Sequence, residues 1–256
     1  MLGKFLASIG IGSAKLDTLL ERAVYSPGDE VRGEVRLKGG NVEQRIETIS
    51  LSVMTQYLRE SGDNKYYENA EIARYEISSP FTLQAGESRE VPFAFPLPAD
   101  TPITVGKTPV WIGTELDIRG ALDPNDNDRI EVRPTPGMNT VLQAAELAGF
   151  RFRNAECEYT RLGGRLPFLQ EFEYVPAGRF RGRLDEIEIA FVRQDANGIE
   201  LLVQIDRRAR GLSSLFAEAL DMDESFVRVR LSAAELAAGP NAVAGKLAGI
   251  IEHYSH

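Results

Sequence analysis

Six arginines in the C-terminal half of the chain are the residues whose type and spacing point most directly to binding chemistry. They are Arg179, Arg181, Arg183, Arg207, Arg208 and Arg210. The first three recur at every second position, which predicts that they share one face of a strand. Guanidinium groups pair well with carboxylates and phosphates, so the six could form a concave cationic strip that docks an acidic or phosphorylated partner segment. The alternative is that they are solvated or paired with nearby carboxylates.

The residues needed for nucleophilic or acid–base catalysis do not occur in useful arrangements. Both histidines, His253 and His256, lie within the last four residues, where a catalytic pair would depend on the chain end. Cys157 is the only cysteine, and the neighbouring charges of Glu156 and Glu158 disfavour a reactive thiolate. The sequence therefore predicts no catalytic residues and a protein that is not an enzyme.

A calcium-loop pattern occurs near the middle of the chain but departs from the motif at two required positions. Its oxygen-bearing residues are Asp123, Asn125, Asn127 and Glu131. Asp128 replaces the glycine of the loop and Pro134 replaces the bidentate glutamate, so we expect a polar turn between strands. Gly245-Lys246 resembles the end of a phosphate-binding loop, but Leu247 stands where the magnesium-binding hydroxyl should be. We therefore predict no metal site and no cofactor.

Composition and charge narrow the class of partner. The 256 residues carry 29 basic and 38 acidic side chains, giving a net charge of −9 and a pI near 5.0, which argues against general binding to nucleic acid. A single cysteine forms no intrachain disulfide and is typical of a reducing compartment. The longest apolar run is shorter than a membrane helix, and no convincing signal peptide is present. We expect a cytoplasmic protein whose partners are other proteins.

Alternating apolar and polar residues predict the strands that must position these side chains. The pattern is clear over residues 31–37, 49–57, 91–97, 110–118, 187–191 and 199–205. Polar or glycine-rich segments separate the runs, which is typical of sandwiches of antiparallel sheets. Helical spacing appears over residues 212–220 and 243–254, a capping box is expected from Ser232 to Glu235, and a bulge is expected near Asp185-Glu186.

The segment Arg133–Gly137, with its two prolines and a glycine, is the best candidate for a linker between domains. It divides the chain into a domain at residues 1–133 and a second domain at residues 138–256. At the other end, residues 2–9 have apolar side chains at helical spacing. A short helix that caps the first domain is one interpretation, and a peripheral membrane or partner-binding helix is the other.

Two motifs resemble the amino-terminal domain of arrestin-fold proteins. One is the run Val24–Val35 with its Ser26-Pro27-Gly28-Asp29 turn, where many arrestins have glutamate in place of Asp29, and the other runs from Pro80 to Pro98. Four further stretches resemble the bacterial sporulation-control family of arrestin-like proteins: Gly12–Leu20, Leu37–Gln44, Leu122–Asp126 and Arg183–Glu188. The resemblance covers nearly the whole chain. It implies an all-β fold with a few short helices, arranged as two arrestin-like antiparallel β-sandwich domains in tandem.

The resemblance also implies a regulatory role in bacterial developmental, stress or cell-envelope pathways. Arrestin-like sandwiches expose strand edges and loops, and we interpret the strand that follows Gly28 as edge-like. The leading hypothesis is therefore a non-enzymatic adaptor or scaffold that binds other proteins, with a homo-oligomer left open. The alternative is a peripheral membrane or lipid-responsive regulator that uses residues 2–9.

Overall fold

The chain folds into two compact units in the computed structural model, which describes residues 14–61, 64–120, 123–162, 164–206 and 226–254. The first unit contains the described parts of Met1–Thr55, Glu71–Thr101 and Val110–Val132. The second contains those of Gln56–Ala70, Pro102–Pro109 and Arg133–His256. The sequence places all of residues 1–133 in one domain, whereas residues 56–70 and 102–109 group with the second unit. Residues 56–70 contain the end of one long strand and the start of the next, and residues 102–109 form a loop. The chain therefore leaves the first unit twice and returns to it.

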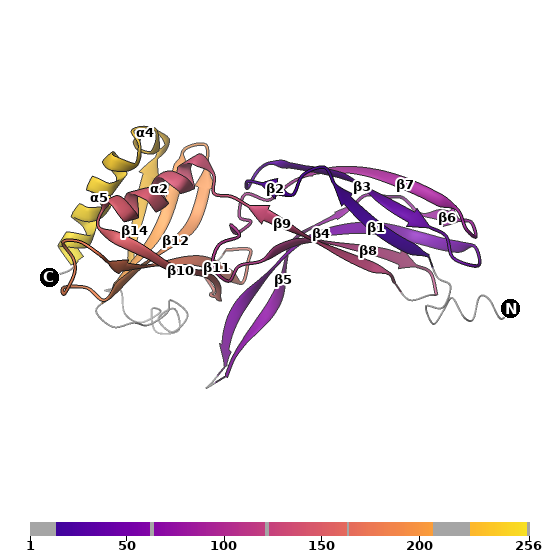
Figure 1. The fold of residues 1–256 in the computed structure, drawn as a ribbon, viewed down its shortest axis with the longest axis horizontal. Coiled ribbons are helices and arrows are strands. Elements are labelled where there is room, and N and C mark those ends of the chain that lie inside the picture. The colour runs from indigo at the N-terminus through magenta and orange to yellow at the C-terminus, as the bar shows by residue number, and fades with distance from the viewer. Residues whose placement is uncertain (1–13, 62–63, 121–122, 163, 207–225, 255–256) are drawn as a thin grey trace. The chain divides into compact units, whose positions relative to one another are not determined.

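Two sheets build the first unit (Figure 1). The smaller has the order β1 (Lys15–Leu20), β3 (Glu30–Lys38) and β7 (Ser88–Pro96), all antiparallel. In the other, β4 (Gln44–Ser61) pairs with β8 (Val110–Ile118), which pairs with β9 (Asn125–Val132). The short strands β2 (Val24–Tyr25) and β6 (Phe81–Leu83) pair with β9 and β4.

In strand β3, the alternation of apolar and polar residues in the sequence corresponds to a buried and an exposed face. Val31, Val35 and Leu37 are buried, while Arg32 and Arg36 are exposed on the opposite face. The preceding turn is closed by a hydrogen bond from the Asp29 amide to the Ser26 carbonyl at 2.9 Å, and Gly28 adopts a φ of +91° that favours glycine. The edge-like interpretation is wrong, because β3 pairs on both sides and is the central strand of its sheet.

The second unit contains an antiparallel sheet with the order β10 (Phe150–Tyr159), β11 (Phe168–Pro176), β12 (Glu186–Asp195), β13 (Gly198–Asp206) and β14 (Phe226–Ser232). The end of β4 joins it through a parallel pairing of Leu58 with Glu158. Strand β5 (Asn64–Glu76) folds back from β4 and pairs with it. The bulges lie at Arg153 and Val192, so the bulge expected near Asp185-Glu186 is wrong.

Three helices pack together and against this sheet: α2 (Pro136–Leu147), α4 (Ala233–Ala237) and α5 (Pro240–Tyr254) (Figure 1). The linker predicted at Arg133–Gly137 is shorter than expected, because α2 already begins at Pro136. Thr135 caps α2 by accepting a hydrogen bond from the Met138 amide, and Pro136 occupies the first turn, where its missing N–H costs nothing. The capping box between Ser232 and Glu235 is present as predicted at the start of α4.

Strands in antiparallel sheets dominate both units and helices are few, which confirms the predicted fold class. The predicted helical segments at residues 2–9 and 212–220 lie outside the described residues. Among the helices that are described, none has the length and apolar content needed to span a membrane.

Candidate protein-binding surface

The first group of arginines predicted from sequence lies in tight turns rather than on a strand. Between β11 and β12, the amide of Arg181 donates to the Gly178 carbonyl and that of Arg183 donates to the Phe180 carbonyl, both at 3.0 Å. Arg179, Arg181 and Arg183 therefore do not share a strand face as their spacing predicted. Their spacing of two residues wrongly predicted a strand, because consecutive turns also place polar residues at short intervals.

Two of these arginines are paired within the protein. Arg183 contacts the Glu252 carboxylate of α5 at 2.7 Å, and Arg179 reaches the same carboxylate at 4.0 Å while its guanidinium lies over the Phe180 ring. Arg181 is exposed. The pairing with carboxylates agrees with the alternative weighed for these residues and ties the turns to α5. Arg207, Arg208 and Arg210 lie outside the described residues.

The candidates for catalysis and metal binding have structural roles. Cys157 is 1% exposed, and burial raises the pKa of its thiol well above the ordinary range, which makes it inert. His253 packs against the Tyr254 ring, and His256 is not among the described residues. Asp123 accepts a hydrogen bond from the Ile118 amide at 2.9 Å and leads into β9. Within the described ranges, no group of three or more His, Cys, Asp or Glu side chains is arranged to hold a metal ion.

The two edge strands of the three-stranded sheet are blocked by specific residues. At β1, Gln44 and Asp126 side chains accept hydrogen bonds from the amides of Ala14 and Thr18. Strand β7 carries two prolines, Pro92 and Pro96, which cannot donate to an added strand. Blocking of this kind prevents unwanted strand pairing.

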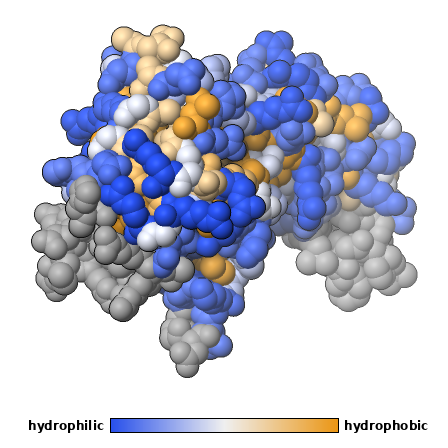
Figure 2. Space-filling view, turned by 60° about the vertical axis from the view of Figure 1, so that its left-hand side comes forward, coloured by the Kyte–Doolittle hydropathy of each residue, from blue (hydrophilic) through white to orange (hydrophobic). Residues whose placement is uncertain are grey.

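Strand β5 is paired on one side only among the described strands. It pairs with β4 and contains no proline, and it carries two adjacent exposed tyrosines, Tyr66 at 41% and Tyr67 at 44% exposure. Exposed large apolar side chains are few in the described parts of the chain: Leu19, Tyr66, Tyr67, Leu147, Leu162 and Tyr254. Figure 2 shows that hydrophilic residues dominate the face in view. A paired tyrosine motif on an open strand edge is therefore unusual on this surface. We call residues 64–70 the β5 edge.

A hollow of about 430 Å³ lies within the second unit, between Tyr67 of β5 and the loop at residues 104–109. It is lined by Gln56, Tyr67, Thr104, Gly106, Lys107, Thr108 and Pro109. Tyr67 donates a hydrogen bond from its hydroxyl to Oε1 of Glu156, and Lys107 Nζ lies 3.6 Å from Oε2 of the same carboxylate. Sequence reasoning missed this surface, because it falls between the strand runs predicted at residues 49–57 and 91–97. The Tyr66-Tyr67 pair was the signal that could have marked it.

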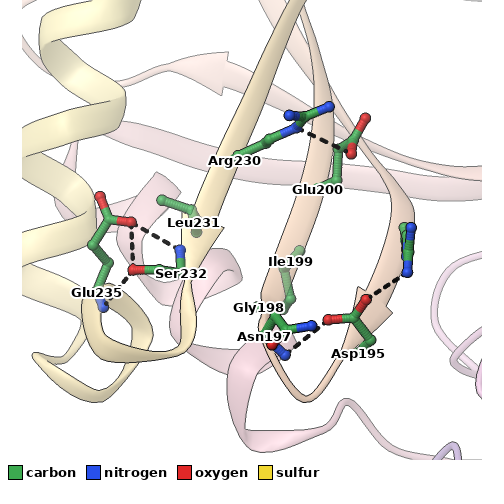
Figure 3. Close-up of a pocket in the computed structure, with 10 residues that line it drawn as sticks. Asp195, Asn197, Gly198, Ile199, Glu200, Arg230, Leu231, Ser232 and Glu235 are labelled. Atoms are coloured by element: carbon green, nitrogen blue, oxygen red, sulfur yellow. Dashed lines mark hydrogen bonds and ion pairs between the residues drawn. The ribbon is translucent and has the colours of Figure 1, made fainter.

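A second hollow, of about 510 Å³, lies at the end of the β12–β13 hairpin and next to β14 (Figure 3). Its charged groups are mostly satisfied by one another: Arg193 pairs with Asp195 at 2.9 Å, and Arg230 pairs with Glu200 at 3.3 Å. Figure 3 also shows the reciprocal capping bonds of Ser232 and Glu235. These contacts hold the end of the sheet to α4.

Lys246 of α5 completes this end of the sheet and blocks the edge of β14. Its ammonium donates to Oε1 of Glu235 at 2.7 Å and to the backbone carbonyl of Arg230 at 2.8 Å. The hydrogen bond from Lys246, together with those from Ser232, lowers the pKa of Glu235 to about 2. The charged carboxylate therefore stabilises the cap above its ordinary pKa, and this contribution is lost as the pH falls from about 4.5 towards about 2.

We expect Lys246→Met to shift the titration of Glu235 towards the ordinary glutamate range, because the largest cause of the lowered pKa is removed. The check is an NMR titration of the Glu235 side-chain carboxyl in both proteins. A Glu235 midpoint near 4.5 in the unmodified chain would contradict the hydrogen-bonded cap. Lys107→Met, which removes a lysine elsewhere in the second unit, is the matched control and should leave the midpoint unchanged.

Buried glutamates occupy one face of the sheet in the second unit. The strand register places Glu156 opposite Glu171 and Glu173 opposite Glu188, with like residues on the same face. Five members are less than 9% exposed: Glu156, Glu158, Glu171, Glu186 and Glu188. Arg153 pairs with Glu173 at 2.8 Å and also with Glu186. The same face carries the apolar cluster of Leu169, Ala190 and Leu202.

The fold defines a strand-rich protein of two compact units, and comparison with known proteins places it in a family. A family model described as "SpoOM protein" matches residues 2–209, so the chain belongs to the Spo0M family. The sporulation-control protein spo0M of Bacillus subtilis (strain 168) is 46% identical over 235 residues, which is 91% of each chain. The crystal structure of Spo0M from Bacillus subtilis superposes with a TM-score of 0.88 at 42% identity, covering 95% of this chain and 100% of that one. The resemblance to the sporulation-control family is confirmed.

Proposed function

We propose that this member of the sporulation-control family is a non-enzymatic regulatory adaptor or scaffold that acts by binding other proteins. The observation that carries the proposal is the β5 edge, which pairs with β4 alone among the described strands and carries two exposed tyrosines. An added strand gains main-chain hydrogen bonds from such an edge, and tyrosines supply large contact area at low entropic cost. The blocked edges of β1, β7 and β14 favour β5 as the docking strand.

Site-specific photocrosslinking in the native cell tests this proposal. A photoreactive phenylalanine analogue is placed at Tyr66 and, as the matched control, at Tyr254, which is 51% exposed on α5. We expect position 66 to crosslink a defined set of proteins that position 254 does not. Identical crosslinks from both positions, or none at position 66, would contradict a docking role for β5.

The affinity test uses a purified protein captured at position 66. We expect Tyr66→Ala to weaken its binding at least tenfold, because an exposed aromatic anchor at a binding edge is worth about 2 kcal/mol. Tyr254→Ala should leave the affinity unchanged. Equal effects of the two substitutions, measured by calorimetry, would show that the β5 edge is not the interface.

A further inference from the structure

Strand β1 is joined to the other sheet of the first unit by a short row of side-chain contacts with β8 and β9. The Thr18 amide donates a hydrogen bond to Oδ2 of Asp126 at 2.9 Å, and the hydroxyl oxygens of Thr18 and Thr114 lie 2.8 Å apart. Both threonines are buried. Because β1 pairs with β3 alone among the described strands, these contacts hold its other side.

Asp128 lies on the core-facing side of β9, next to this row. It is opposite Ile112 of β8 in the strand register, and both Ile112 and Ile130, two positions further along β9, are buried. The Oδ2 atom of Asp128 is shielded from solvent and has no hydrogen-bond partner among the described residues. Buried polar atoms normally have a partner, and an ionised carboxylate without one is costly.

The charges that act on Asp128 are negative. Burial has the largest effect, followed by the charges of Asp126 on β9 and Asp17 on β1, and together they raise the pKa of Asp128 to about 6. The residues that β8 places opposite Asp128 and Asp126 are Ile112 and Thr114, which carry no charge. In the unfolded chain Asp128 ionises near its ordinary 3.8. The stability that its protonated form contributes is therefore present at low pH and is lost as the pH rises from about 3.8 through about 6.

We propose that Thr18, Thr114, Asp126 and Asp128 form a pH-sensitive contact that holds β1 against β9 when Asp128 is protonated and loosens β1 when Asp128 is ionised. An ionised Asp128 places a second carboxylate beside Asp126, whose hydrogen bond to Thr18 joins the two strands. Among the described strands, β1 has no neighbour on that side to retain it. The inference is independent of docking at the β5 edge, because this contact lies in the first unit and residues 64–70 lie in the second.

Hydrogen exchange of the Thr18 amide in the full chain, at pH 5 and at pH 8, tests this contact. After correction for the intrinsic exchange rate, we expect the protection of this amide to fall about tenfold between the two pH values, given the folded and unfolded pKa of Asp128. Asp128→Asn keeps the shape of the protonated acid, so its Thr18 protection should not change with pH. Asp117→Asn is the matched control, because it removes a carboxylate from the exposed face of β8 and should retain the tenfold fall.

Three results would overturn the proposal. The first is a Thr18 protection that is equal at pH 5 and pH 8, or a fall that persists in Asp128→Asn. The second is equal protection of Thr18 and of the amides in the middle of β4, a strand with partners on both sides, because the whole unit would then open together. The third is a loss of stability of Asp128→Asn in urea unfolding at pH 8, which would show that the ionised carboxylate stabilises the contact. We expect this variant to be folded and at least as stable as the unmodified chain at pH 8.

Discussion

Gly106→Ala is expected to destabilise the second unit by roughly 4 kcal/mol, combining a strained backbone with a steric clash. The φ of +62° disfavours any residue with a Cβ, and that Cβ would meet backbone atoms of Ala155 at 2.2 and 2.7 Å. Backbone atoms of a central strand cannot move aside as a flexible side chain can. The loop must therefore leave β10, and Lys107 must lose its position beside Glu156.

Gly182→Ala is the matched control, because Gly182 belongs to the same unit and has a φ of +79° with no atom within 4 Å of the added Cβ. It isolates the backbone strain, which should cost about 1 kcal/mol. Urea unfolding followed by circular dichroism compares the two variants. Hydrogen exchange at the Lys107 amide, which bonds to Ala155, should become fast only in Gly106→Ala. Equal losses of stability in the two variants would show that close packing of the loop is unimportant.

Glu188→Gln is expected to stabilise the protein at neutral pH, by on the order of 2–3 kcal/mol at pH 7. Glu188 is 2% exposed, and burial, together with the charges of Glu186, Glu158 and Glu173, raises its pKa to about 9. In the unfolded chain this carboxyl ionises near its ordinary 4.5. The stability contributed by the protonated form is therefore present at low pH and is lost as the pH rises from about 4.5 through about 9. A glutamine keeps the shape of the protonated acid and removes that loss.

Glu173→Gln, on the same sheet face, is expected to change the stability in the opposite direction. Glu173 accepts hydrogen bonds from Arg153 at 2.8 and 2.9 Å, so removal of its charge should destabilise the protein. Urea unfolding from pH 5 to pH 9 measures both variants. The gain from Glu188→Gln should increase with pH across this range. A gain that is absent or independent of pH would show that Glu188 is ionised in the folded protein.

The candidate binding surface could be predicted only in part. The sequence pointed to Arg179, Arg181 and Arg183, but their apparent strand periodicity arose in turns, where local spacing says little about direction. It gave no indication that residues 64–70 form an open edge, because edge status depends on which strands lie alongside. The blocking of β1 by Asp126 joins residues 108 positions apart, which no local pattern reveals.

Local chemistry in the sequence determined the strands, the turn at Pro27-Gly28, the capping box at Ser232 and the family, since each depends on neighbouring residues or on an extended series of motifs. It did not determine which strand would be central, which edge would be open, or which carboxylates would share a buried face. Those properties depend on pairing between distant segments, which places β3 between β1 and β7 and brings Tyr67 and Lys107 to Glu156. Tertiary structure alone decided them, because burial and partner geometry are set by the assembled sheet.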